Sequence, residues 1–191
     1  MAETDNEKLD QIIQDCVRKI ERSQGTLYKL FFGYALSVAM IYNNRREDAL
    51  EVVNDSFMKV FSEIDKFDKS QPFKWWLRKI VINTSIDRLR KRRNQYLSID
   101  QEAEVLQVKD ENADVISRLA AEDVLRLLNG LPDAHRVVFC LYEIDGFSHR
   151  EIAERLHIPE SSSRVLLTRA KKQLRELFPL YFNTKLLGYG N

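Results

Sequence analysis

Glycine and proline are scarce in this chain, with 6 Gly and 4 Pro among 191 residues. The segments between them place apolar residues three or four positions apart, the spacing that gives an α-helix one apolar face. Hydrophobic residues make up 44% of the sequence, which is enough to build folded cores and argues against a disordered chain. The sequence therefore predicts an all-α protein.

The predicted helices fall into two groups, separated by a polar, acidic stretch that cannot bury much apolar surface. The first group has helices at about 7–21, 27–42, 46–64 and 73–93, with Gly25 between the first two and a loop at 65–72. The second group has a helix around 124–128 and helices at about 131–144, 148–156 and 160–178. We predict two small helical domains, with these bounds: an N-terminal bundle at 1–95, an acidic flexible linker at 96–118, a C-terminal helix-turn-helix domain at 119–178 and a tail at 179–191.

Charge is distributed unevenly along the sequence. The total is +1, from 30 basic and 29 acidic residues. Residues 1–93 contain 18 basic and 14 acidic side chains, residues 94–123 contain 2 and 8, and residues 124–191 contain 10 and 7. Two basic lobes around an acidic strip suggest a nucleic-acid partner more strongly than the near-neutral total does.

Two tandem helices near the C-terminal end predict a helix-turn-helix. Ser148 and Glu151 have the spacing of a capping box at the start of the first helix, and Pro159 precedes the second. The outward side of the second helix carries polar and basic residues, namely Arg164, Thr168, Lys171 and Arg175. Such a helix can enter the major groove of DNA, where basic side chains neutralise phosphates. The alternative is an ordinary helical hairpin with a solvated basic face.

The predicted helix at 73–93 is apolar on two sides. One arc consists of Phe73, Trp76, Leu77 and Ile80, and the other of Trp75, Ile82, Ile86 and Leu89. The polar seam between them contains Lys79, Asn83 and Arg90. Such a helix is normally sandwiched between neighbours, but aromatic rings beside cations also suit single-stranded nucleic acid. We expect Trp76 to lie in the core, whereas the spacing leaves Trp75 undecided.

The helix at 46–64 carries an acidic stripe on the side opposite its apolar residues. The stripe consists of Asp48, Glu51 and Asp55. It is either a solvated face or a surface that docks a basic partner, and the spacing does not decide between the two.

Enzymatic functions are not supported by the sequence. The three histidines, His135, His149 and His157, have no Cys or paired carboxylates at metal-ligand spacing. There is no glycine-rich phosphate loop and no nucleophile with a matched base. We therefore predict no catalytic site, no metal or other cofactor and no small-molecule substrate. No run is long enough for a membrane span, and the acidic start is unlike a signal peptide, so we expect a cytoplasmic protein.

Two blocks of the sequence resemble bacterial RNA polymerase sigma factors. The core-binding and promoter-melting region of that family is similar to DALEVVNDSFMKVFSEIDKF followed by PFKWWLRKIVINTSIDRLRKRR. The C-terminal promoter-binding region is similar to LPDAHRVVFCLYEIDGFSHREIAERLHIPESSSRVLLTRAKKQLREL. With these two blocks and a short acidic linker, residues 20–178 resemble the extracytoplasmic-function (ECF) subgroup. The resemblance implies a non-enzymatic subunit that binds core RNA polymerase and directs promoter-specific transcription initiation.

The resemblance also implies roles for individual residues. Core polymerase would be bound by Asp48, Glu51, Asn54 and Asp55. The minus-ten element, melted with one base flipped out, would be bound by Lys69, Ser70, Phe73, Trp76, Asn83, Arg88 and Arg90. The minus-thirty-five duplex would be read by Ser161, Ser162, Arg164, Thr168, Arg169, Lys171 and Lys172. An anti-sigma factor, often membrane-bound, is the implied regulator.

Two other functions stay open on the sequence alone. One is a stand-alone helix-turn-helix regulator that binds duplex DNA without polymerase. The other is a protein-interaction adaptor that uses its acidic and basic faces structurally. The sequence also departs from the family in places, since Ser161–Ser163 replaces a frequent Gly-Thr-Val and Trp75 beside Trp76 is unusual.

Overall fold

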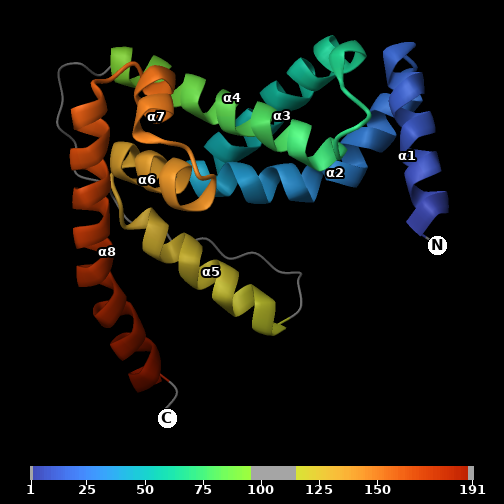
Figure 1. Cartoon of the computed structure of the whole chain (residues 1–191). Helices are drawn as coiled ribbons and strands as arrows, with labels where there is room; N and C mark the ends of the chain where they lie inside the picture. Colours follow the sequence, from blue (N-terminus) through green and yellow to red (C-terminus); the bar gives the residue numbers. More distant parts are fainter. Residues whose placement is uncertain (1, 96–114, 189–191) are drawn as a thin grey trace.

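The protein is built from helices throughout the part of the chain that its structure describes. This computed structural model describes the backbone of residues 2–95 and 115–188, and the side chains of residues 7–92 and 122–179. Every regular element within these ranges is helical (Figure 1). The predicted all-α fold class is therefore confirmed.

The N-terminal unit (residues 2–95) is a helical bundle. Its elements are α1 (Ala2–Val17), α2 (Glu21–Tyr42), α3 (Arg46–Glu63), the 3-10 turn η1 (Ile64–Lys66) and α4 (Phe73–Gln95). Helices α2, α3 and α4 pack against one another, and α1 packs on α2 at one end of the bundle (Figure 1). Leu27, Val53 and Leu77 bring one fully buried side chain from each of the three packed helices. Each such burial stabilises the bundle by roughly 1.5–3 kcal/mol.

The turn between α1 and α2 lies before Gly25, so the prediction that Gly25 separates the two helices is wrong. Gly25 lies inside α2 and faces open space. The turn is instead made by Lys19, which has a left-handed φ of 61°. The N–H of Lys19 donates to the backbone carbonyl of Cys16 at 2.9 Å, and the N–H of Ile20 donates to the backbone carbonyl of Asp15 at 3.0 Å. These two bonds form a Schellman motif, which satisfies the last carbonyls of α1 without a glycine.

Aromatic side chains hold the start of α4 against the bundle. Phe73 is 3% exposed, and its ring centroid lies 4.7 Å from that of Phe31 in α2 and 5.5 Å from that of Phe67. Trp76 is half-buried and packs on Phe67 at 5.2 Å. The expectation that Trp76 belongs to the core is therefore confirmed, although part of its surface stays accessible.

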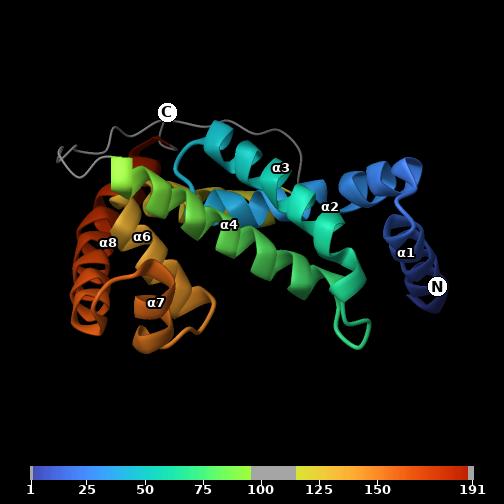
Figure 2. The same cartoon turned by 90° about the horizontal axis from the view of Figure 1, so that it is seen from above.

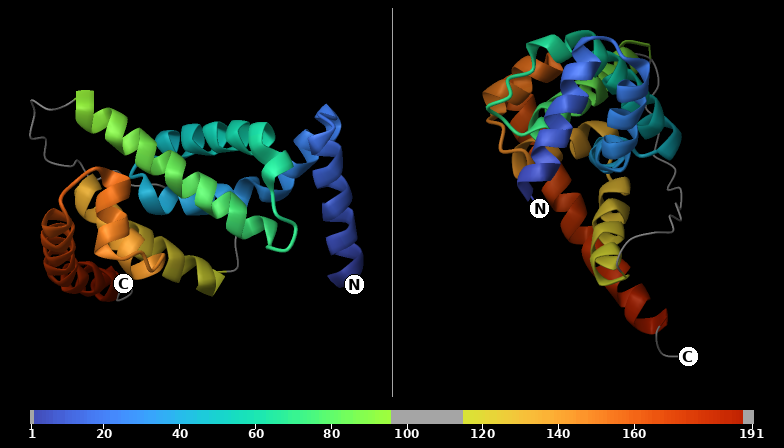
Figure 3. Two further views of the ribbon diagram at one scale, coloured as in Figure 1. Left: turned by 45° about the horizontal axis from the view of Figure 1, so that its top comes forward. Right: turned by 90° about the vertical axis from the view of Figure 1, so that its right-hand side faces the viewer.

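The C-terminal unit (residues 115–188) contains the predicted tandem helices. Its elements are α5 (Val115–Asn129), α6 (Asp133–Phe139), the π-helical turn η2 (Cys140–Ile144), α7 (His149–Leu156) and α8 (Glu160–Gly188). The chain leaves η2 through Gly146, whose φ of 73° suits glycine. The far ends of α5 and α8 extend away from the N-terminal unit (Figure 3).

The predicted linker lies mostly outside the described residues. Residues 96–114 are not described, whereas α5 already begins at Val115, inside the range assigned to the linker. Helix α8 also continues past the predicted end at Phe178 and includes Pro179. The backbone of residues 179–188, within the range predicted as a tail, is therefore helical.

The two units pack against each other. Contacts join α2 to α5 and α6, and α4 to α7. The C-terminal unit lies beside the end of α4 that is farther from α1 (Figures 2 and 3). Residues of α4 that were predicted to bind DNA therefore lie close to the C-terminal unit.

Arg136 of α6 is the central polar contact between the units. Its side chain is fully buried and donates to the carbonyl oxygens of Met40 at 2.5 Å and Ile41 at 2.7 Å. It also donates to the side-chain oxygens of Asn44 and Asn129. The carbonyls of Met40 and Ile41 lie in the last turn of α2, where helical carbonyls lack intrahelical partners. Arg136 therefore caps a helix of the other unit.

Asp145 forms a second polar contact between the units. Its carboxylate accepts hydrogen bonds from the hydroxyl of Tyr42 and from Arg78, whose Nη2 lies 2.6 Å away. Burial raises the pKa of Asp145 to about 6. Asp145, which directly follows η2, is therefore joined to both α2 and α4.

Candidate nucleic-acid interface

The predicted helix-turn-helix is formed by α7 and α8. Ser148 caps α7 by accepting from the N–H of Glu151 at 3.3 Å, while its own N–H donates to the Glu151 carboxylate at 2.8 Å. These two bonds confirm the predicted capping box. His157 ends α7 in the left-handed region with a φ of 51°. Because Ile152, Leu156, Leu167 and Ala170 are buried between the helices, the opposite side of α8 faces outward.

The outward side of α8 carries most of the residues predicted to read duplex DNA. Ser161 is exposed and Ser162 is half-buried at the start of the helix. Arg164 is exposed and pairs with Glu160 at 2.5 Å. One turn further on, Arg169 is exposed, and Lys172 reaches Glu176 only at 4.0 Å. These weakly held cations can reach phosphates without first breaking a buried contact.

Two predicted residues of α8 already have partners within the protein. Lys171 is half-buried, lies 2.6 Å from Glu143 and sits 5.8 Å from the ring centroid of Tyr142. The hydroxyl of Thr168 donates to the carbonyl of Arg164 in its own helix. Glu143 and Tyr142 belong to η2, so spacing within α8 could not reveal that they hold Lys171.

His149 also contributes to the helix-turn-helix, although no role in DNA binding was predicted for it. Its ring stacks on that of Tyr142 at 4.6 Å, and its Nδ1 lies 3.0 Å from the hydroxyl of buried Ser163. Burial and the nearby charge of Arg164 lower the pKa of His149. His149 therefore ties the start of α7 to the first turn of α8 and helps to set the angle of the outward helix.

The polar seam of α4 is in contact with the C-terminal unit. Asn83 accepts a hydrogen bond from Arg155 of α7 at 2.9 Å. Arg90 donates to the backbone carbonyl of Arg155 at 3.1 Å. Two predicted minus-ten residues are thus brought together, and both are engaged by the first helix of the helix-turn-helix.

Arg88 lies on another side of α4 and holds the acidic stripe of α3. It reaches Asp48 at 2.9 Å and Glu51 at 2.5 Å, and Arg92 also pairs with Asp48. Asp48 is buried, so the stripe is not uniformly solvated as its spacing suggests. Burial alone would raise the pKa of Asp48, but the hydrogen bonds and charges of Arg92 and Arg88 hold it below its usual range. Asp48 and Arg88 therefore join α3 to α4.

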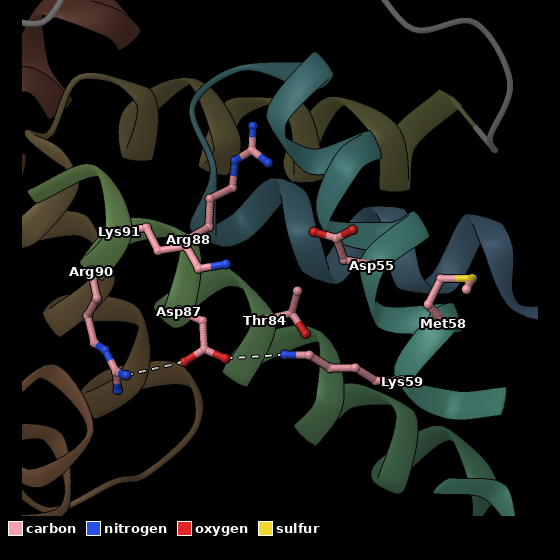
Figure 4. A pocket seen from close by; sticks show the side chains of 8 residues that line it. All are labelled: Asp55, Met58, Lys59, Thr84, Asp87, Arg88, Arg90 and Lys91. Carbon is pink, nitrogen blue, oxygen red and sulfur yellow. Dashed lines mark hydrogen bonds and ion pairs between the residues drawn. The ribbon is translucent and has the colours of Figure 1, made fainter. Parts of the chain in front are cut away.

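An open cleft of about 640 Å³ lies between α3 and α4. Asp87 lies in the middle, 3.2 Å from Lys59 and 3.7 Å from Arg90 (Figure 4). Exposed Asp55 and Met58 line the α3 side. Glu51 and Asn54, two further residues of the predicted polymerase-binding surface, are also exposed, and Tyr28 donates to Asn54 at 3.0 Å.

The loop before α4 is held by local hydrogen bonds. Asp68 accepts from the N–H of Ser70 at 2.9 Å and from its hydroxyl at 2.7 Å, and these bonds lower the pKa of Asp68. Lys69 and Ser70 are exposed, whereas buried Phe73 lies behind the loop. The prediction that Phe73 faces DNA is corrected accordingly: its ring supports the loop from inside.

No metal-binding cluster and no membrane-spanning helix occur among the described residues. Within these ranges, no three His, Cys, Asp or Glu side chains are grouped so as to hold a metal ion. None of the helices searched there is both long and apolar enough to cross a bilayer.

Comparisons with known proteins identify the same two blocks. The family "Sigma-70 region 2" matches residues 27–95, and the family "Sigma-70, region 4" matches residues 121–174. The ECF RNA polymerase sigma factor SigW of Bacillus subtilis is 30% identical over 158 residues, which cover 75% of this chain and 81% of that protein. The ECF RNA polymerase sigma-E factor of Escherichia coli is 25% identical over 175 residues, covering 86% and 92%.

One solved structure with a similar chain is the sigma factor RpoE of Bartonella quintana, in complex with the anti-sigma factor NepR. It has a TM-score of 0.49 and 21% identity, covering 81% of this chain and 96% of that one. The identity to SigW over most of its length, together with both sigma regions in order, decides the family. The chain belongs to the ECF RNA polymerase sigma factors, and its function is promoter-specific transcription initiation rather than enzymatic catalysis.

Proposed function

We propose that three surfaces of this chain divide the work of initiation. The exposed part of α3 binds core RNA polymerase. The loop before α4 and the polar seam of α4 bind the melted minus-ten element. The outward side of α8 binds the minus-thirty-five duplex. The observation that carries this assignment concerns α4. This helix packs against neighbours on several sides, yet two polar residues of its seam, Asn83 and Arg90, stay half-exposed.

The polymerase-binding surface consists of Glu51, Asn54 and Asp55. All three are exposed, and they follow one another at helical spacing on α3. Asp48 contributes indirectly, because its pairing with Arg88 and Arg92 fixes α3 against α4. An acidic helical face of this kind suits a basic partner surface.

The α8 surface combines a helix start with cations. Ser161 and Ser162 lie at the N-terminal turn, where free backbone N–H groups favour a phosphate. Arg164, Arg169 and Lys172 extend the positive side of the helix, while Thr168 lies between them. Basic side chains contribute affinity through phosphates, and the first turn contributes base contacts.

We infer that the two units separate when the promoter is bound. Asn83 accepts from Arg155 at 2.9 Å and Arg90 donates to the backbone carbonyl of Arg155 at 3.1 Å, so DNA competes with α7 for these two residues. The contacts of Arg136 and Asp145 hold the same arrangement. If the promoter binds the separated, open form and not the packed, closed form, the apparent affinity equals the intrinsic affinity multiplied by the fraction of molecules that are open.

The cellular compartment of the protein can be inferred from its proposed partners. Core polymerase and chromosomal promoters are in the bacterial cytoplasm, so we place the protein there. The resemblance to ECF sigma factors also implies an anti-sigma factor, and a factor that stabilises the closed form would inhibit initiation without covering every DNA-binding residue.

In vitro transcription with purified core polymerase tests the proposal. The wild-type chain is expected to give promoter-dependent transcripts. Reversing the charges of Glu51 and Asp55 to lysine should weaken core binding at least about tenfold, because close interfacial charge pairs couple by about 1.5 kcal/mol or more. Both side chains are exposed, so the helical signal should be retained, and loss of the Glu51 pair with Arg88 should lower the unfolding midpoint only slightly.

The matched control reverses Glu7 and Asp10, which are exposed acidic residues of α1 outside the proposed surfaces. This control changes net charge by the same amount and should leave core binding intact. Equal weakening by both double variants would show that only total charge matters. Tight duplex binding with no transcripts would instead indicate a stand-alone DNA-binding regulator.

A further inference from the structure

Glu143 holds Lys171 from outside α8, unlike the acidic partners of two other cations on this helix. Its Oε1 lies 2.6 Å from Nζ of Lys171, and the side chains of Lys171 and Glu143 are 40% and 35% exposed. Arg164 and Lys172 instead pair with glutamates four residues away in α8 itself, at more exposed positions. Exposed pairs within one helix contribute little and are readily exchanged. The Glu143 contact therefore constrains a predicted DNA-binding cation from a second element.

Glu143 is held in place by the turn that carries it. It belongs to the π-helical turn η2, in which the N–H of Asp145 donates to the carbonyl of Cys140 at 3.1 Å. Tyr142, the preceding residue, places the centroid of its ring 5.8 Å from Nζ of Lys171. One turn thus presents an acid and an aromatic ring to the same ammonium. Helical turns of this kind are rare and are frequent at functional sites.

The pair reduces what Lys171 gains from a DNA phosphate. Sequence-independent binding is driven by cations that neutralise phosphates and release counterions. The carboxylate of Glu143 already offsets the charge of Lys171, and it would repel any phosphate that approached the same ammonium. While the pair persists, Lys171 therefore contributes little to binding at arbitrary sequences.

A base edge in the major groove is a different partner for Lys171. An ammonium has three N–H donors, so Lys171 can keep Glu143 and still donate to an acceptor on a base. The O6 and N7 atoms of guanine are such acceptors, and they occur only at particular positions of a sequence. They carry no net charge for Glu143 to repel. The arrangement thus weakens a phosphate contact and preserves a contact that carries sequence information.

We propose that Glu143 is a specificity-determining residue of the minus-thirty-five surface. It acts through Lys171 and is therefore a positioning residue. It offsets the charge of Lys171 against phosphates, which lowers affinity for duplex of any sequence, and it orients the ammonium toward a base edge. This inference rests on the proposed function, because it needs the outward side of α8 to bind duplex DNA.

A first experiment compares two duplexes by fluorescence anisotropy on the full chain. One duplex is enriched from a random library by the wild type, and the other is a scrambled duplex of equal length and composition. Glu143→Gln should raise affinity for the scrambled duplex at least about threefold and steepen its salt slope by about one, because one more phosphate is neutralised. Affinity for the enriched duplex should change less than about twofold, since Lys171 is bound to its base there.

The matched control is Glu122→Gln. Glu122 lies on α5, outside the proposed surfaces, and pairs loosely with Arg126 at 3.8 Å. This control removes the same charge from the same unit and should leave both affinities unchanged. An equal rise in Glu122→Gln and Glu143→Gln would show that total charge explains the effect and would overturn the inference.

A second experiment removes the whole pair and keeps the net charge. The double variant Glu143→Gln with Lys171→Met should bind the scrambled duplex within about twofold of wild type, because a neutral pair is lost. It should bind the enriched duplex at least about fivefold more weakly, because a base contact is lost. In the Lys171→Met background, Glu143→Gln should no longer steepen the salt slope. Equal losses on both duplexes would refute a role in specificity and leave Glu143 with a structural one.

The outcomes separate this inference from the proposed function. If the wild type enriches no sequence from the library, the assignment of α8 to the minus-thirty-five duplex is wrong. If it enriches a sequence and Glu143→Gln raises both affinities equally, only the role of Glu143 is refuted.

Discussion

Replacing Arg136 with methionine should uncouple the two units of the protein. Methionine keeps an unbranched apolar stem in the buried site but removes all donors to the end of α2. Burial lowers the pKa of Arg136 only to about 10, so the guanidinium is charged at neutral pH and its hydrogen bonds are charge-assisted.

The expected loss of docking free energy between the two units is large compared with the net stability of a small protein. Hydrogen bonds to a charged donor contribute about 1.5–3 kcal/mol each, and the carbonyls of Met40 and Ile41 each lose one. A buried carbonyl that loses its donor costs about 1–3 kcal/mol for as long as it stays away from water. Separation of the units lets water reach the two carbonyls, so we expect this free energy to be lost from docking rather than from the fold of each unit.

Urea unfolding with two probes measures the uncoupling. Both tryptophans, Trp75 and Trp76, lie in α4, so fluorescence follows the N-terminal unit, whereas far-ultraviolet circular dichroism follows all helices. The wild type should show coincident transitions, and Arg136→Met should show separated ones. Its radius of gyration in small-angle scattering should increase. Arg150→Met is the control, because Arg150 is 79% exposed and pairs only loosely with Glu154 at 3.9 Å; its effect should stay within about 0.5 kcal/mol.

Coincident transitions in Arg136→Met, with a shift below about 1 kcal/mol and unchanged scattering, would refute the role given to this residue. Loss of helical signal without denaturant would also refute it, since Arg136 would then be folding its own unit rather than joining two.

Three further predictions follow from buried and exposed side chains. Phe73→Ala should destabilise the N-terminal unit by about 3–5 kcal/mol in urea unfolding, because its ring is a packed core group. The pKa of Asp48 is held below the ordinary 3.8, so its carboxylate contributes stability above that pH, and this stability is lost as pH falls through the folded pKa. Asp48→Asn should therefore lower the free energy of unfolding at pH 7 and make that free energy depend less on pH below pH 4. Arg169→Ala should weaken duplex binding and lower the salt slope of the binding constant by about one, measured by anisotropy at several salt concentrations.

The elements predicted most accurately are those whose signals are local. The bounds of α3 and α7 agree with the sequence to within one or two residues. The capping box of Ser148 and Glu151 needs only four consecutive residues, and both of its hydrogen bonds are present. Apolar spacing likewise identified α4 as a helix packed on more than one side.

The errors arose where a distant or backbone contact competes with a local signal. Gly25 suggested a break, but the Schellman motif at Lys19 satisfied the end of α1 earlier and let the glycine stay helical. Asp48 lies on the same acidic stripe as Glu51 and Asp55, and its spacing predicts a similar exposure. It is instead buried where it pairs with Arg88 and Arg92 of α4. Both arginines lie about forty residues away in sequence, so no spacing rule within α3 could place them.

The amino-acid sequence by itself determined the helical class, the helix-turn-helix and the family, because periodicity, caps and motif order are encoded in neighbouring residues. Only the tertiary structure decided that Arg155 covers Asn83, that Arg136 caps α2 from another unit and that Trp75 is left exposed. The exposure of a side chain and its hydrogen-bond partners depend on which helices meet in space. Residues such as Arg155 and Asn83 are far apart in sequence, and no local sequence pattern indicates that they are in contact.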